Sequence, residues 1–170
     1  IDLTENVLGP IATQTLGDMG ADVIKIETPR GDPMRQLGLR RNEGMASHFL
    51  AFNRNKRSVT LDLKQEKGRE LLYRLVEQAD VFYTNYTAAV AKRLSVDYET
   101  LRKLNPKLVY ATSSTYGPEG PWAERRGFDQ TAQLGVSLVD RGRFAGVRSK
   151  AAVGVQCDSI HADDGRAGRR

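Results

Sequence analysis

Basic and amide side chains recur in this 170-residue sequence directly after runs of apolar and β-branched residues. They are Arg30 and Arg35, Lys56 and Arg57, Lys64, Asn85, Arg93, and the pair Arg125 and Arg126. Arginine and lysine bind phosphate oxygens through charge-assisted hydrogen bonds, so a group of them can hold a polyphosphate ligand. Each residue taken alone is explained as well by an ordinary surface charge. An anion site therefore requires a fold that brings several of them to one place.

The order of the expected elements predicts such a fold. Strands are expected over residues 1–3, 21–27, 58–63, 80–84 and 108–112, and helices over 9–19, 65–79, 88–94 and 97–104. In the second helix, Leu71, Leu72, Leu75 and Val76 are expected on one buried face. Strands alternating with helices predict an α/β fold, a Rossmann-like parallel sheet with helices on both faces. Ligands of such sheets bind beyond the carboxyl ends of the strands, where the loop over 28–42 and the other cation-bearing loops are expected.

Several other functions lack their sequence signatures. The glycine fingerprints of dinucleotide and nucleoside-triphosphate sites are absent. One cysteine, Cys157, and two histidines exclude an internal disulfide and give no basis for a metal site. No apolar run reaches the ~20 residues that span a bilayer, and Ile1 does not open a secretory leader. We therefore expect a cytoplasmic protein with no metal and no membrane partner.

Nucleic acid and phosphorylated small molecules both suit the net charge of +5. Nucleic-acid binding through the basic segment 53–57 lacks interleaved aromatic residues and any known motif, so no nucleic-acid partner is expected.

A series of segments resembles the opening of the class III CoA-transferases. In chain order they are Asp2-Leu3-Thr4 with Gly9-Pro10, Leu16 to Glu27, Phe52 to Ser58 leading into Leu61 to Lys64, Asn85-Tyr86, Arg93-Leu94, Leu104-Asn105-Pro106, Tyr116-Gly117-Pro118 and Gly127 to Gln130. The resemblance covers residues 1 to about 133 and implies a coenzyme A-binding α/β domain, the N-terminal part of the family's large domain, with its first strand clipped. Residues 134–170 are expected to be a divergent or out-of-frame tail that is poorly ordered.

The resemblance also implies which residues contact coenzyme A. They are Val7 and Leu8 beside the thioester, Thr28 and Arg30 at the nucleotide, Leu61 and Lys64 at a strand end, Asn85 and Tyr86 along the pantetheine and adenine, Arg93 at a phosphate, and Arg126 near the cofactor. From residue types alone, Val7 and Leu8 are equally explained as packing at a helix entry, and Tyr86 as a core residue.

The family's chemistry depends on an aspartate nucleophile, and the resemblance places it at Asp158. Its carboxylate would attack an acyl-CoA thioester to give a mixed anhydride, and coenzyme A would pass to a small carboxylic acid. Cys157 and the Gly- and Arg-rich residues that follow depart from the family pattern. If the tail is out of frame, the chain lacks its nucleophile. Relatives form interlocked homodimers.

Two alternatives stay open within the same fold. An α-methylacyl-CoA racemase would need a histidine where this chain has Phe128, which cannot transfer protons. A non-catalytic fragment that only binds coenzyme A is the other alternative.

Overall fold

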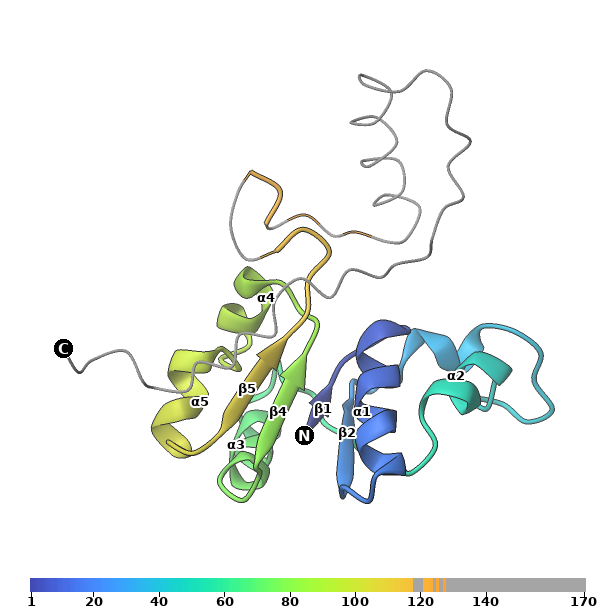
Figure 1. The fold of residues 1–170 in the computed structure, drawn as a ribbon, viewed down its shortest axis with the longest axis horizontal. Helices are drawn as coiled ribbons and strands as arrows, with labels where there is room; N and C mark the ends of the chain where they lie inside the picture. Colours follow the sequence, from blue (N-terminus) through green and yellow to red (C-terminus); the bar gives the residue numbers. More distant parts are fainter. Residues whose placement is uncertain (118–120, 124, 126, 128–170) are drawn as a thin grey trace.

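The computed structural model describes residues 1–117, 121–123, 125 and 127 (Figure 1). The predicted residues Arg126 and Asp158, and the predicted domain boundary near residue 133, lie outside these described residues.

Five short strands form one parallel sheet in the order β3-β2-β1-β4-β5 (Figure 1). Their bounds are Asp2–Leu3 for β1, Val23–Glu27 for β2, Lys56–Thr60 for β3, Val81–Thr84 for β4 and Val109–Thr112 for β5. The chain runs outward from β1 to β3 and then returns to pair β4 with the other side of β1. This reversal is the topological switch point at which α/β sheets bind ligands, and it lies between β1 and β4.

Five helices and one 3-10 turn connect the strands. The helices are α1 (Leu8–Asp18), α2 (Ser47–Phe52), α3 (Glu66–Val76), α4 (Ala88–Arg93) and α5 (Tyr98–Leu104), and the turn η1 spans Pro33–Gln36. Side chains of one sheet face contact α1, and those of the other face pack with α3, α4 and α5. The predicted Rossmann-like α/β fold with helices on both faces is confirmed.

The sheet face toward α3, α4 and α5 is apolar. Its fully buried side chains include Phe82 of β4, Leu72 and Val76 of α3, and Leu101 of α5. Leu71 does not belong to this face, because it is 48% exposed, and the prediction that it is buried is wrong. Leu72 and Val76 are separated by four residues, so they form one stripe along α3, and Leu71 lies on the flank of that stripe.

The sheet face toward α1 is polar and charged. The Asp2 carboxylate forms an ion pair of 2.9 Å with the Lys56 ammonium, and both side chains are at most 1% exposed. Asp2 also accepts hydrogen bonds from the amide and hydroxyl of Thr4 and from the Thr13 hydroxyl of α1. Burial raises the pKa of Asp2, but the neighbouring Lys25 and Lys56 outweigh it, and the pKa lies below its ordinary value. Burial keeps the pKa of Lys56 below its ordinary value even beside Asp2.

Strand β3 begins two residues before the predicted strand. Lys56 and Arg57 pair with Val23 and Ile24 of β2, so they lie at the amino end of the strand. The expectation that these two cations lie at the carboxyl edge of the sheet is therefore wrong. The apolar segment before β3 forms the short helix α2, and the loop after β2 contains η1.

Asp97 caps α5, because its carboxylate accepts hydrogen bonds from the amide (3.2 Å) and hydroxyl (2.8 Å) of Thr100. Asp97→Ala should lower the free energy of unfolding by about 1 kcal/mol, since it removes a cap from the first turn. Urea denaturation measures the loss. Glu99→Ala, which removes an exposed carboxylate 3.8 Å from Arg102, should have a smaller effect. Equal losses would contradict the capping role.

Candidate functional site

A cavity of about 390 Å³ lies at the carboxyl edge of the sheet. The segments that follow β2, β3 and β4 supply most of its lining, together with Leu3 of β1 and Leu94 after α4. Five residues predicted from the sequence line this cavity: Thr28, Arg30, Leu61, Lys64 and Tyr86. The fold thus brings together residues that are up to 58 positions apart in the chain.

The rim of this cavity carries two exposed cations, Arg30 and Lys64. Neither side chain has a carboxylate partner among the described residues, so both charges are available to an anion. The lining includes the buried apolar side chains of Leu61 and Leu63, which are 8% and 7% exposed, and the carboxylates of Glu27 and Asp62. Positive charge beside a buried apolar surface suits a ligand that joins phosphates to a flat aromatic base.

The segment that carries Lys64 is fixed by the helix that follows it. Arg69 of α3 donates hydrogen bonds to the carbonyl oxygens of Leu63 (3.1 Å) and Lys64 (3.0 Å). Gly68, also in α3, lies directly against Asp62: a Cβ atom at Gly68 would be 2.1 Å from the Asp62 carbonyl oxygen. A glycine is therefore required where α3 begins, because any side chain would displace this wall of the cavity.

Asn85 and Tyr86 connect the two sides of the switch point. The Asn85 amide accepts a hydrogen bond from the Glu5 amide (3.0 Å) and donates one to the Glu5 carbonyl (2.8 Å). The Tyr86 hydroxyl donates to the Glu5 carboxylate at 3.2 Å. Burial and the Glu5 charge raise the pKa of Tyr86 well above its ordinary value, so the phenol stays protonated. Asn85 thus holds the loops after β1 and β4 together, and Tyr86 forms part of the cavity wall.

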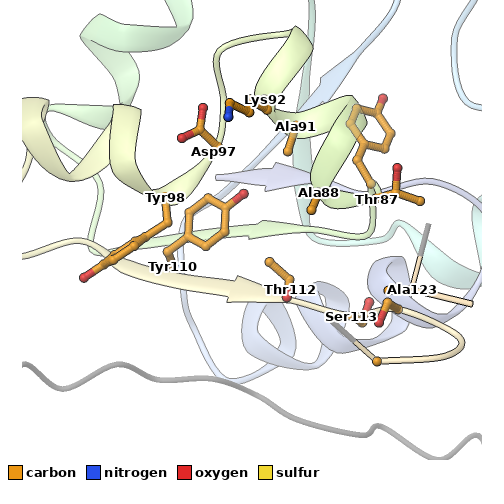
Figure 2. Close-up of a pocket in the computed structure, with 13 residues that line it drawn as sticks. Thr87, Ala88, Ala91, Lys92, Asp97, Tyr98, Tyr110, Thr112, Ser113 and Ala123 are labelled. Carbon is orange, nitrogen blue, oxygen red and sulfur yellow. The ribbon is translucent and has the colours of Figure 1, made fainter. Parts of the chain in front are cut away.

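A second cavity, of about 300 Å³, lies beside the first, between α4, α5 and β5 (Figure 2). Tyr86 lines both cavities. Tyr98 and Tyr110 lie side by side at one end, with their ring centroids 5.8 Å apart. The buried Ser113 hydroxyl, which also lines this cavity, has no hydrogen-bond partner among the described residues.

Four predicted coenzyme A contacts in the described part of the chain line neither cavity: Asn85, Val7, Leu8 and Arg93. Val7 immediately precedes α1 and is 39% exposed, and Leu8 is the first residue of the helix. Arg93 is exposed at the end of α4, where its neighbour Lys92 lines the second cavity instead. Sequence position alone does not distinguish Lys92 from Arg93, because the turn of a helix decides which side chain faces a cavity.

Glu27 and Arg35 form a site that residue types alone did not predict. Arg35 donates from Nη2 and Nε to the two carboxylate oxygens of Glu27, at 2.5 and 2.6 Å. Burial raises the pKa of Glu27, but hydrogen bonds from Arg35, Ser58 and the Asp32 amide outweigh it and lower the pKa to about 2. Arg35 was expected as a free cation at the strand edge, and its pairing with Glu27 corrects that expectation. The sequence signal that could have indicated this pair is a carboxylate at the end of β2, Glu27, eight residues before an arginine, Arg35.

The family to which the chain belongs follows from its sequence and fold together. The model described as CoA-transferase family III matches residues 1–155. The chain belongs to CoA-transferase family III. This match confirms the resemblance noted from the sequence and continues past residue 133.

Named relatives agree with this membership of family III. A succinate–glutarate CoA-transferase of Agrobacterium fabrum is 42% identical, with 95% of this chain and 46% of that protein covered. A mouse succinyl-CoA:glutarate CoA-transferase is 37% identical, with 78% of this chain and 30% of that protein covered. The crystal structure of a CAIB/BAIF family protein from Brucella suis has a TM-score of 0.75 at 43% identity, covering 81% of this chain and 38% of that chain.

The family III chain studied here spans less than half the length of these relatives. Among the described residues, no group of three or more histidine, cysteine, aspartate or glutamate side chains could hold a metal ion. In the same part of the chain, no helix has both the length and the apolar character to cross a membrane.

Proposed function

We propose that this chain is the coenzyme A-binding part of a CoA-transferase, which moves coenzyme A from an acyl-CoA thioester to a small free carboxylic acid. The observation that supports it most is the cavity at the carboxyl edge, where Arg30 and Lys64, which have no carboxylate partner among the described residues, lie beside buried leucine side chains. Coenzyme A joins a pyrophosphate and a 3′-phosphate to adenine, so it needs both kinds of surface. Membership of CoA-transferase family III supplies the reaction class.

In this proposal, Arg30 and Lys64 bind phosphate oxygens, and Leu61 and Tyr86 contact the adenine. Tyr86 is suited to that contact because its ring is half-buried and its hydroxyl is already bound to Glu5. Val7, Leu8, Asn85, Arg93 and Arg126 remain proposed coenzyme A contacts.

Asp158 is the proposed nucleophile. Its carboxylate oxygen would attack the thioester carbonyl carbon, the C–S bond would break, and coenzyme A would leave as the thiolate. The thiolate would attack the aspartyl carbonyl of the resulting anhydride, which releases the first acid and leaves an aspartyl-CoA thioester. The second acid would displace the thiolate to form a new anhydride, and the thiolate would attack the acyl carbonyl of that anhydride to give the new acyl-CoA and free Asp158. We further propose that the complete protein works as a homodimer, as the resemblance to the family implies, and that it is located in the cytoplasm.

Calorimetric titration of the chain with coenzyme A tests the binding part of this proposal. Arg30→Gln and Lys64→Gln should each raise the dissociation constant about tenfold, or about 1.4 kcal/mol, because each removes a charge-assisted contact to phosphate. Lys67→Gln is the matched control, since Lys67 is an exposed cation of α3 that does not line the cavity. Titration with pantetheine, which lacks the phosphates, should show no difference between the variants.

Two results would contradict this assignment. One is a wild-type chain that does not bind coenzyme A, and the other is an equal loss of affinity in Lys67→Gln. Turnover is tested separately by mixing the chain with an acyl-CoA and an isotope-labelled carboxylate, and by following the label into thioester. Binding without transfer would favour the non-catalytic fragment.

A further inference from the structure

We propose that Glu27, Asp32 and Arg35 are positioning residues that hold the turn Thr28–Arg30 in the shape that receives coenzyme A. The inference rests on the proposed function for its ligand. It assigns to Arg35, a cation near the cavity, a role other than phosphate binding. We call these three side chains the turn clamp.

Glu27 is the centre of the turn clamp. Its carboxylate is 3% exposed and accepts four hydrogen bonds, from Arg35 Nη2 (2.5 Å), Arg35 Nε (2.6 Å), Ser58 Oγ (2.5 Å) and the Asp32 amide (2.9 Å). The two bonds from Arg35 are bidentate, which fixes the direction of the guanidinium as well as its distance. Glu27 therefore binds β3 through Ser58 and binds the far end of the turn through Asp32.

Asp32 connects the turn clamp to the centre of the sheet. Its Oδ2 atom forms a buried ion pair of 2.9 Å with Lys25 Nζ, and Lys25 in turn donates to the Thr4 carbonyl at 2.7 Å. Its Oδ1 atom accepts a hydrogen bond from the Met34 amide at 2.9 Å and so caps η1. The end of the turn is thus tied to the strand end at the switch point.

Arg35 supports the clamp from its outer side. Its guanidinium carbon lies 3.6 Å from the centroid of the Phe49 ring of α2, and Nη1 donates to the Gly44 carbonyl at 3.1 Å. Hydrogen bonds to Glu27 raise the pKa of Arg35 above its ordinary value. With its charge balanced by Glu27 and its face stacked on Phe49, Arg35 is committed to protein contacts.

The turn itself is short and closed at both ends. The Glu27 carbonyl accepts from the Leu61 amide at 2.9 Å, and the Thr28 carbonyl accepts from the Gly31 amide at 2.8 Å. Gly31 has a φ of +76°, a conformation that favours glycine. Between these fixed points Thr28 and Arg30 are exposed and line the cavity. A turn held in this way presents Arg30 to a ligand with a reduced backbone ordering cost on binding.

The experiment is a double-mutant cycle on coenzyme A affinity, measured by calorimetry with the full chain. Arg35→Gln should raise the dissociation constant about tenfold, and Arg35→Lys should raise it less, because lysine keeps the charge but not the bidentate geometry. The combined Arg30→Gln/Arg35→Gln variant should bind as Arg30→Gln alone does, since Arg35 acts through Arg30. Additive effects, near a hundredfold, would show that Arg35 contacts the ligand itself and would overturn the inference.

Arg57→Gln is the matched control, because Arg57 pairs with Asp22 on the exposed surface, with 65% and 69% of the side chains accessible. It should leave coenzyme A affinity unchanged. A loss equal to that of Arg35→Gln would assign the effect to net charge and would also overturn the inference.

Amide hydrogen exchange tests the turn clamp independently of coenzyme A binding. In Glu27→Gln the Asp32 amide should exchange faster than in the wild type, while the amides of β2 keep their protection. Unchanged exchange at the Asp32 amide would overturn the positioning role, whether or not the wild type binds coenzyme A. A wild type that binds no coenzyme A would instead count against the proposed function. Should Glu27→Gln unfold, Ser58→Ala removes one bond to the same carboxylate and gives the same comparison.

Discussion

Replacing Asp2 with alanine should lower the free energy of unfolding of the chain by about 3–5 kcal/mol. The variant leaves the Lys56 ammonium, 1% exposed, without its 2.9 Å carboxylate partner in a site that water does not reach. The hydroxyls of Thr4 and Thr13 lose their acceptor at the same time. Urea denaturation at neutral pH, where Asp2 is ionised, measures the loss.

Two variants test whether the loss of stability comes from a buried charge without its partner. Asp2→Ala/Lys56→Met removes both charges and should recover much of the stability, because no charge of this ion pair is then left buried without its partner. Asp22→Ala breaks the exposed pair with Arg57 and should cost less than about 1 kcal/mol. A double variant as unstable as Asp2→Ala would contradict this explanation.

The same ion pair makes stability depend on pH in a known direction. The pKa of Asp2 is lower in the folded chain than its ordinary value. Its contribution is therefore present above the ordinary pKa of an aspartate and is lost as the pH falls through the lowered pKa. The stability difference between the wild type and Asp2→Ala should shrink over that acidic range.

Gly68→Ala should lower the free energy of unfolding by about 3 kcal/mol, the upper part of the range for overpacked sites. On helix propensity alone the change would gain about 1 kcal/mol, since alanine is the better helix former. The sign reverses because the new Cβ atom would lie 2.1 Å from the Asp62 carbonyl oxygen and 2.8 Å from its carbon. Both are backbone atoms, so the strain cannot be relieved by turning a side chain.

The displaced segment is also a wall of the cavity, so Gly68→Ala should weaken coenzyme A binding as well. Thermal or urea denaturation and calorimetric titration measure the two effects. Glu70→Ala, at an exposed position of the same helix, should change neither by much. A Gly68→Ala chain as stable as the wild type would mean that α3 approaches Asp62 less closely than described.

Periodicity and glycine or proline punctuation predicted most of the fold. All five strands, and the helices α1, α3, α4 and α5, lie within a few residues of their expected positions. These elements have local signals: Pro10 lies in the first turn of α1, Gly20 follows the end of that helix, and Asp97 caps α5. Parallel order then follows from the short right-handed connections.

Elements without a local signal were mislocated or missed. β3 begins at Lys56 because its backbone pairs with β2 along five residues. This pairing joins residues far apart in the sequence, so no local pattern indicates it. Lys56 also looks like a surface charge until Asp2, 54 positions earlier, is placed beside it. η1 was missed although Asp32-Pro33 is a turn signal, since the whole segment was interpreted as loop.

The candidate site was predicted in part. Strand-end position predicted Arg30 and Lys64, and the resemblance to the family predicted Thr28, Leu61 and Tyr86. All five line one cavity. Neither signal was enough to show that the Asn85 amide is fully bound to Glu5, or that Arg35 is bound to Glu27. Both facts depend on side-chain directions, which the position of a residue in the sequence does not give.

The charges beneath α1 also bear on how the chain avoids misfolded sheets. Asp2, Lys25 and Lys56 come from three different strands, and Asp2 stands directly opposite Lys25 in the β1–β2 ladder. A slip of one residue would turn a charged side chain to the apolar face, among Leu3, Ile26 and Phe82. Apolar residues alone tolerate such slips, because one aliphatic contact resembles another. The three charges therefore select a single strand order and register, so their exact pairing matters for folding to one structure as well as for its stability.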